Sequence, residues 1–155
     1  MTETTASPLD SMLCFAVYSA ANATVQAHRA VLAPWDLTYT QYLVLVLLAD
    51  AGEGLPMRDL GDRLSLDSGT LSPLVRRLER RGLLTRQRSA GDERLVDVAL
   101  TDAGRTAHAE LTEAIGCLAP AYGVASADEL EALIASLQGL ATGMRAAAAD
   151  ARRPS

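Results

Sequence analysis

The chain has 155 residues, of which 49% are hydrophobic and 4% aromatic, and its formal net charge is −5. A chain of this length can bury one hydrophobic core, and its apolar content excludes general disorder. It contains no run of about 18 apolar residues. The first ten residues lack the basic-then-apolar pattern of a signal peptide. We therefore expect no membrane contact and a cytoplasmic protein.

A basic segment interrupts this acidic chain. Seven arginines and three acidic residues lie between Arg76 and Arg94. Binding to nucleic acid depends on the local electrostatic field, so the acidic net charge does not exclude it.

Two helices are predicted in the first third of the chain. Ser7 and Pro8 suit a helix start, and apolar residues at spacings of three and four continue to about Leu32. A second, almost wholly apolar helix is predicted from Gln41 to about Ala51, capped by the three residues before it. The first helix is long for a domain of this size, so it needs an extended packing partner. A second subunit would provide such a packing partner.

The remaining pattern alternates short helices with a hairpin. A turn ending in an N-cap is expected at 66–68, a helix-ending glycine at Gly82, and a polar turn at 89–93 between two strands. Thr101 and Ser126 are the expected caps of the last two helices. The predicted elements, in order, are helices 56–64 and 68–81, strands 83–88 and 95–100, and helices 102–118 and 126–149.

This order predicts a fold that is mainly α with a small β-hairpin wing, a winged helix-turn-helix. We expect a single domain over 1–155. Segment 38–100 would form the DNA-binding lobe, and segments 8–33 and 102–149 would form dimerisation helices. A helix-turn-helix places its second helix in the DNA major groove, here the helix 68–81.

The candidate DNA-binding residues come from that helix and from the hairpin. Small hydroxyl residues and arginines suit contacts to bases and phosphates, and a wing arginine can enter a minor groove. Asp92 can orient Arg94 through a bidentate ion pair. On the helix the candidates are Ser68, Thr70, Ser72, Arg76 and Arg77, and at the expected hairpin tip they are Arg86, Arg88, Asp92 and Arg94.

Three stretches resemble one bacterial family. Residues 60–86, the triplet Asp92-Glu93-Arg94 and the LTDAG motif ending at Gly104 resemble the MarR family of regulators. The resemblance covers roughly residues 9 to 115. It implies an obligate homodimer, joined through its N- and C-terminal helices, that binds pseudo-palindromic double-stranded DNA operators. Half-sites would then lie about 34 Å apart.

Further stretches are similar to one branch of that family, the organic-hydroperoxide sensors of OhrR type. These are LCFAVY from Leu13, LTYTQYL from Leu37 and LDSGTL from Leu66. The resemblance implies that organic hydroperoxide oxidises Cys14 and that the repressor then releases DNA. Tyr39 matches the tyrosine that hydrogen-bonds the thiolate.

This chain departs from that branch at His28, where a second tyrosine is usual. A histidine can still donate a hydrogen bond and, if charged, favours the thiolate. Cys14 and His28 are 14 positions apart on one helix, about 21 Å, so they can cooperate only across a dimer. Cys117 falls near the cysteine that, in the two-cysteine subgroup, forms an intersubunit disulfide with the oxidised thiol. The alternative is that a small thiol caps Cys14.

A MarR-type repressor released by a small aromatic or phenolic ligand is the main alternative, with Trp35, His28 and Arg29 lining a pocket and Cys14 inert. Enzyme signatures such as HExxH, CxxC and GxSxG are missing from the sequence, so we do not expect an enzyme. No metal or cofactor is expected, because the two cysteines and two histidines lack close ligand spacing.

Overall fold

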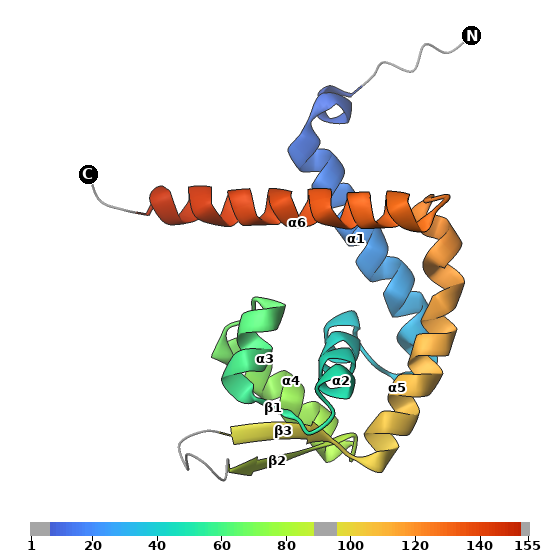
Figure 1. Cartoon of the computed structure of the whole chain (residues 1–155), viewed down its shortest axis with the longest axis vertical. Coiled ribbons are helices and arrows are strands. Elements are labelled where there is room, and N and C mark those ends of the chain that lie inside the picture. Colours follow the sequence, from blue (N-terminus) through green and yellow to red (C-terminus); the bar gives the residue numbers. More distant parts are fainter. Residues whose placement is uncertain (1–6, 89–95, 153–155) are drawn as a thin grey trace. The chain divides into compact units, whose positions relative to one another are not determined.

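The computed structural model describes residues 7–88 and 96–152. It falls into two compact units, Met1–Leu118 and Ala119–Ser155 (Figure 1). The expected fold class is confirmed, because the elements are helices with a small antiparallel sheet. The single-domain assignment and its division into dimerisation helices and a DNA-binding lobe stay predictions.

The N-terminal arm consists of two helical segments instead of the single predicted helix. A 3-10 helix, η1 (Pro8–Ser11), is capped by Ser7, whose backbone N–H donates to the Asp10 carboxylate at 2.9 Å. The α-helix α1 then spans Leu13–Leu32. Met12 between them is extended, with φ −95° and ψ 115°, so the helical hydrogen bonding restarts there.

A reciprocal cap starts α2 (Tyr39–Ala51), which follows the short 3-10 helix η2 (Ala33–Trp35). The backbone N–H of Thr38 donates to Gln41 Oε1 at 2.9 Å, and the backbone N–H of Gln41 donates to Thr38 Oγ1 at 3.3 Å. This capping box satisfies two N–H groups at the helix start. The helix therefore begins two residues before the predicted start at Gln41.

The core of the first unit surrounds α2. Its side chains Val44, Leu45 and Leu48 are at most 1% exposed, and α2 packs against α1, α4 and α5. Burying a leucine stabilises the fold by about 1.5–3 kcal/mol, which explains the nearly all-apolar composition of α2. Among the described residues no single helix is long and apolar enough to span a membrane; the segments Leu13–Trp35 and Tyr39–Ala51 pass that test only together, across a 78° bend.

The predicted helix-turn-helix is present. It consists of α3 (Met57–Leu64) and α4 (Ser68–Arg80), joined by a turn in which Ser65 has a φ of 55°. Asp67 is the N-cap of α4, and Gly82 just beyond the helix has a φ of 71°. The apolar face of these helices is buried at Leu60, Leu71, Val75 and Leu78.

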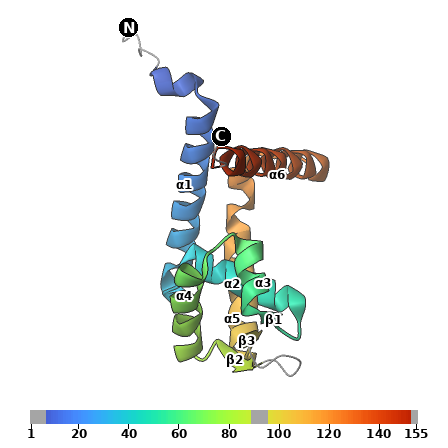
Figure 2. The same cartoon turned by 90° about the vertical axis from the view of Figure 1, so that its left-hand side faces the viewer.

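Three strands form the wing sheet, which lies at the end of the first unit opposite η1 (Figures 1 and 2). Strands β2 (Leu84–Arg88) and β3 (Val96–Leu100) pair antiparallel, with Leu84 opposite Leu100. The short strand β1 (Leu55–Pro56) pairs with β3 on its other side, giving the order β1-β3-β2. The strand β1 was not predicted, because two residues, one of them proline, carry no strand pattern. The predicted turn lies outside the described residues.

Helix α5 (Asp102–Ile115) is fixed by the LTDAG motif to the end of α4, the second or recognition helix of the helix-turn-helix. Thr101 Oγ1 accepts from the backbone N–H of Gly104 at 3.0 Å and donates to the Gly82 carbonyl at 2.6 Å. A Cβ atom at Gly104 would overlap the carbonyl oxygen of Leu83, so a glycine is required for this close approach. Past Ile115 the chain tightens into the 3-10 helix η3 (Gly116–Tyr122), where the sequence predicted α-helix to about residue 118.

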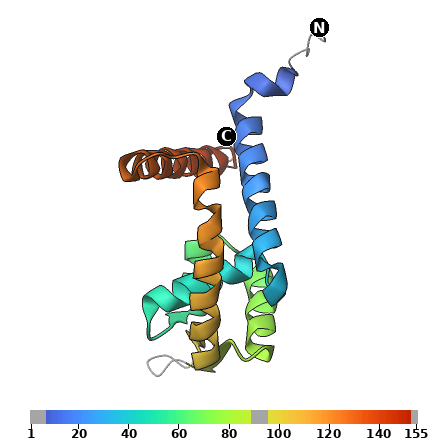
Figure 3. The ribbon, with the colours of Figure 1, turned by 90° about the vertical axis from the view of Figure 1, so that its right-hand side faces the viewer.

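The second unit is built on α6 (Ala127–Asp150), close to its predicted bounds (Figure 3). Ser126 caps it by accepting from the backbone N–H of Glu129 at 3.2 Å. No residue of α6 is buried. Five large apolar side chains of this helix are exposed to solvent: Leu130, Leu133, Ile134, Leu137 and Met144.

Candidate nucleic-acid interface and thiol site

The N-terminus of α4 is held by Asp67. Its Oδ1 accepts from the backbone N–H of Thr70 at 2.9 Å, and its Oδ2 accepts from the Thr70 hydroxyl at 3.0 Å. The backbone bond first, and the hydroxyl bond second, lower the pKa of the Asp67 carboxyl from its ordinary value of 3.8. Thr70 was predicted to contact DNA, and its hydroxyl hydrogen is already committed to Asp67. The hydroxyl oxygen can still accept.

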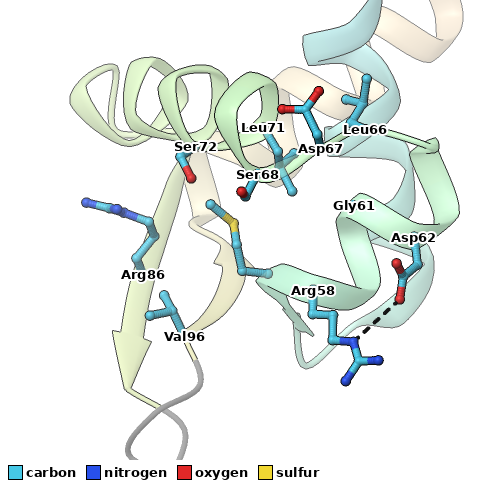
Figure 4. Close-up of a pocket in the computed structure, with 11 residues that line it drawn as sticks. Arg58, Gly61, Asp62, Leu66, Asp67, Ser68, Leu71, Ser72, Arg86 and Val96 are labelled. Carbon is cyan, nitrogen blue, oxygen red and sulfur yellow. Dashed lines mark ion pairs between the residues drawn. The ribbon is translucent and has the colours of Figure 1, made fainter.

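A hollow of about 560 Å³ lies between α3, the start of α4 and the wing sheet (Figure 4). The predicted contact residues Ser68 and Ser72 line it from α4, and Arg86 lines it from β2. Arg58 and Asp62 of α3 form an exposed ion pair of 3.8 Å at its edge (Figure 4). Ser68 is exposed and Ser72 is half-buried, so the structure brings both serines to one concave surface beside the wing.

Three exposed arginines follow along α4. Arg76, Arg77 and Arg80 line a second hollow of about 520 Å³ together with Glu79 and Arg86. Guanidinium groups suit phosphate oxygens because they are planar, permanently charged and carry several donors. This cluster is the basic surface expected from the sequence, with one acidic residue inside it.

Arg86 differs from its predicted setting. It lies in the middle of β2, opposite Val98, and not at the hairpin tip. Its Nε and Nη2 lie 2.8 Å and 2.7 Å from Glu79 Oε2, and both side chains are about one-third exposed. Arg88, at the end of β2, is exposed. The other two wing candidates, Asp92 and Arg94, lie outside the described residues, so their pairing stays a prediction.

Arg81 forms a contact that was not predicted from the sequence. At the C-terminal end of α4 it donates from Nη1 to the Asp36 carbonyl at 2.7 Å and from Nη2 to the Trp35 carbonyl at 2.5 Å. Trp35 Nε1 in turn donates to Glu110 Oε2 of α5 at 3.2 Å. The recognition helix is thereby tied to the α1–α2 connection and on to α5. No local sequence pattern could reveal the contacts of Arg81, because Asp36 and Trp35 are 45 or more residues away in the chain.

The candidate sensing thiol is accessible. Cys14 lies in the first turn of α1, is exposed and forms no disulfide. Tyr18, one turn along, is also exposed, and its ring lies 6.4 Å from that of Phe15. Cys117 is likewise exposed and free, in η3. The described residues include no group of three or more His, Cys, Asp or Glu side chains that could hold a metal ion.

The two predicted thiol-activating residues lie together at the other end of α1. His28 is 4% exposed, and its ring centroid lies 4.4 Å from that of Tyr39, with a 49° angle between the ring planes. His28 Nδ1 is 2.8 Å from the Thr24 carbonyl oxygen. Because α1 is continuous from Leu13 to Leu32, Cys14 of the same chain is about 21 Å away along the helix.

A third hollow, of about 470 Å³, adjoins this ring pair. Tyr39 and Arg29 line it, with Val25, Leu37 and Asp36. Arg29, which was predicted to line a ligand pocket, lies in the wall of this hollow, and its role there stays a prediction. Trp35 and His28, the other two predicted lining residues, are not part of this hollow's wall.

Comparison with known proteins identifies the family. Residues 35–95 match the model of the MarR family. The chain is 56% identical over 97 residues to the HTH-type transcriptional regulator TtmR of Methylorubrum extorquens, covering 63% of this chain and 49% of TtmR. It is 42% identical over 96 residues to the organic hydroperoxide resistance transcriptional regulator of Bacillus subtilis, covering 62% and 65%. The crystal structure of AbfR from Staphylococcus epidermidis matches with a TM-score of 0.74 and 30% identity, covering 85% of this chain and 90% of AbfR.

This chain belongs to the MarR family. AbfR has also been solved bound to DNA in its reduced and overoxidized forms, each with a TM-score of 0.71. The chain spans about half of TtmR and just under two thirds of the Bacillus regulator. The match to the MarR family model covers the helix-turn-helix and Tyr39 but neither cysteine.

Proposed function

We propose that this DNA-binding regulator of the MarR family is a homodimeric repressor that releases a pseudo-palindromic operator when an organic hydroperoxide oxidises Cys14. One observation carries the proposal: an exposed thiol lies at one end of α1, and the buried ring of His28, in contact with the half-buried ring of Tyr39, lies near the other. The separation is too large for contact within one chain. Two α1 helices that cross in a dimer would bring each thiol to the ring pair of the other subunit.

Exposed apolar surface supports the dimer. On the N-terminal arm the exposed large apolar side chains are Leu9, Met12, Leu13, Tyr18 and Val25. The second unit exposes a comparable set on α6. Large exposed apolar patches on soluble proteins commonly mark interaction surfaces, and a second copy of the chain would cover each of these sets. The predicted dimerisation segments 8–33 and 102–149 contain both sets.

The DNA-binding half of the proposal rests on the surface of α4. Its serines border the hollow beside the wing, and its exposed arginines lie further along the helix. In a two-fold dimer these helices would enter successive major grooves about 34 Å apart. The relatives support this assignment, since AbfR is found on DNA in two oxidation states and the Bacillus regulator is named for organic hydroperoxide resistance.

A gel-shift titration tests the proposal. An operator duplex selected from random DNA would be incubated with the protein, with its Cys14→Ser variant and with its Cys117→Ser variant, before and after cumene hydroperoxide. We expect release from the unaltered protein and retention by the Cys14→Ser variant. Release of the DNA by both the unaltered protein and the Cys14→Ser variant would overturn the proposal. Mass spectrometry of Cys14 identifies the oxidised species.

Cys117 is proposed as the residue that resolves the oxidised thiol. A sulfenic acid at Cys14 would condense with a partner thiol to form an intersubunit disulfide. Non-reducing electrophoresis after peroxide treatment should then show a dimer band that is lost in both single cysteine variants. A band that survives in the Cys117→Ser variant would contradict this role, and a small-thiol adduct on Cys14 would identify the other route.

A second candidate function is favoured by the hollow beside Arg29. Its wall combines apolar side chains, the Arg29 guanidinium and the Tyr39 ring, and these could hold a small aromatic or phenolic ligand whose binding would release DNA with Cys14 inert. The Cys14→Ser variant separates the two functions. It should no longer respond to hydroperoxide, whereas a ligand-released repressor would respond to its ligand with or without the thiol.

A further inference from the structure

The surroundings of His28 determine which of its ring nitrogens carries hydrogen. Nδ1 lies 2.8 Å from the carbonyl oxygen of Thr24, one turn earlier in α1. A carbonyl oxygen can only accept a hydrogen bond, so Nδ1 must be the donor. In the neutral ring, the lone pair available for accepting a proton is therefore on Nε2.

The second ring nitrogen, Nε2, has no hydrogen-bond partner among the described residues. The His28 residue as a whole is 4% exposed, so a group that meets Nε2 would have to reach it from the surface beside Tyr39. A buried ring with one nitrogen anchored and the other open is arranged to meet a group from outside the chain.

The titratable and charged groups around His28 come from α1, α2 and α5. Tyr39 of α2 is the titratable side chain in contact with the ring. Arg29 is the other ionisable residue of the second half of α1. On α5, which also packs against α1, Glu110 accepts from Trp35 and Arg105 pairs with Asp102. His28 forms no ion pair within residues 7–88 and 96–152.

We propose that His28 transfers the proton in thiol oxidation, an assignment that rests on the proposed function. Nε2 takes the proton from the thiol of the partner subunit's Cys14, leaving a thiolate beside an imidazolium. The thiolate sulfur attacks the terminal oxygen of the hydroperoxide, an S–O bond forms, and the O–O bond breaks. The sulfur is oxidised to sulfenic acid, and the peroxide is reduced to an alkoxide. The alkoxide takes the proton from Nε2 and leaves as the alcohol, which restores the neutral ring.

A tyrosine at this position could not perform both steps. Phenols ionise near pH 10, so at neutral pH a tyrosine donates a hydrogen bond to a thiolate but does not remove the proton from a thiol. An unperturbed thiol ionises near pH 8.5 and is mostly protonated at neutral pH. A histidine whose Nε2 can accept a proton is therefore expected to raise the rate of thiol oxidation above that with tyrosine most strongly at neutral pH, where the thiol needs a base.

The test compares His28→Gln and His28→Tyr in a Cys117→Ser protein, with His108→Gln as the matched control. The rate of Cys14 oxidation by cumene hydroperoxide is measured between about pH 6 and pH 9. At pH 7 we expect both His28 variants to react at least about tenfold more slowly than the control. The deficit should shrink as pH rises and the thiol ionises by itself. A deficit that is equal at all pH values, or absent, would overturn this role.

A measurement on the unaltered ring keeps the test independent of the variants' folding. In ¹⁵N-histidine-labelled protein carrying His108→Gln, His28 is the only histidine, because the chain contains two. At about pH 9, above the ordinary histidine range, we expect nitrogen shifts of a protonated Nδ1 and a bare Nε2; the reverse would overturn the assignment. If Cys14 of the otherwise unaltered protein is not oxidised at all, the proposed function fails and this role fails with it. Oxidation without the pH-dependent deficit removes the role of His28 alone.

Discussion

Arg81 at the end of the recognition helix donates to the backbone carbonyl of Asp36, 45 residues earlier, at 2.7 Å. Together with its second bond to the Trp35 carbonyl, this contact joins α4 to the connection that follows His28 and precedes Tyr39. It ties α4 to the segment that connects α1, which carries His28, with α2, which carries Tyr39. A shift of that connection would therefore change the position of α4 or break the two Arg81 hydrogen bonds.

Arg81→Ala should therefore weaken both stability and DNA binding. Two charge-assisted hydrogen bonds are lost, but the side chain is exposed, so we expect a loss of about 1 kcal/mol in the free energy of unfolding. Urea unfolding and gel-shift titration measure the two effects. Arg63→Ala on α3 is the control for stability, because Arg63 forms no hydrogen bond within the described chain. Equal stability of Arg81→Ala and the unaltered protein would show that the link is not formed in solution.

The ion pair between Glu79 and Arg86 leads to a second prediction. Glu79→Gln removes an acidic group from the basic cluster and releases Arg86. We expect tighter DNA binding and a steeper salt dependence, with the slope of log K against log salt rising by about one. Glu113→Gln on α5 serves as the charge-matched control. Weaker binding by Glu79→Gln would instead show that the pair positions Arg86 on the DNA.

The cap at Asp67 predicts a pH dependence. Its pKa is lowered in the folded state, so its stabilising contribution is present above the unfolded value, ordinarily 3.8, and is lost as pH falls through the lower folded value. Asp67→Asn should therefore melt at a lower temperature than the unaltered protein at about pH 6. The difference should diminish below about pH 4. A difference that stays constant down to about pH 3 would exclude the charge of Asp67 as its cause.

Gly104→Ala tests the attachment of α5. The added methyl would overlap the Leu83 carbonyl, which is backbone and cannot move aside alone. We expect a loss of about 1–3 kcal/mol in the free energy of unfolding, measured by urea titration. Gly116→Ala is the matched control, since nothing lies within 4 Å of its added Cβ, and it should change stability by less than about 0.5 kcal/mol. Equal stabilities for the two variants would contradict the close approach of α5 to Leu83.

Local signals accounted for most of the fold. Thr38, Thr101 and Ser126 were recognisable as caps because capping depends on a few adjacent residues. The break at Met12 and the strand β1 were missed. Met12 has no helix-breaking composition, and β1 exists through its pairing with β3, about 40 residues away. Contacts between distant segments are not encoded in periodicity.

In the candidate site, too, some features could be predicted from the local sequence and others depend on contacts between distant segments. The outward positions of the α4 arginines followed from the amphipathic pattern of that helix, whereas the exposure of Cys14 and the Glu79–Arg86 pair required the fold. The contact between His28 and Tyr39 was likewise not readable from residues 11 positions apart, although a resemblance pointed to both. The Thr24 carbonyl that orients His28 is backbone, so no side-chain motif could reveal it.

Mixed dimers test the central claim most directly, namely that the thiol of one subunit is activated by the ring pair of the other. In a Cys117→Ser background, a Cys14→Ser subunit is paired with a His28→Gln subunit and purified through two different tags. The single remaining Cys14 then faces an intact His28 only if the site forms between subunits. We predict that this thiol reacts with cumene hydroperoxide at neutral pH at the rate of the unaltered site. A rate as slow as that of the His28→Gln homodimer would contradict the account.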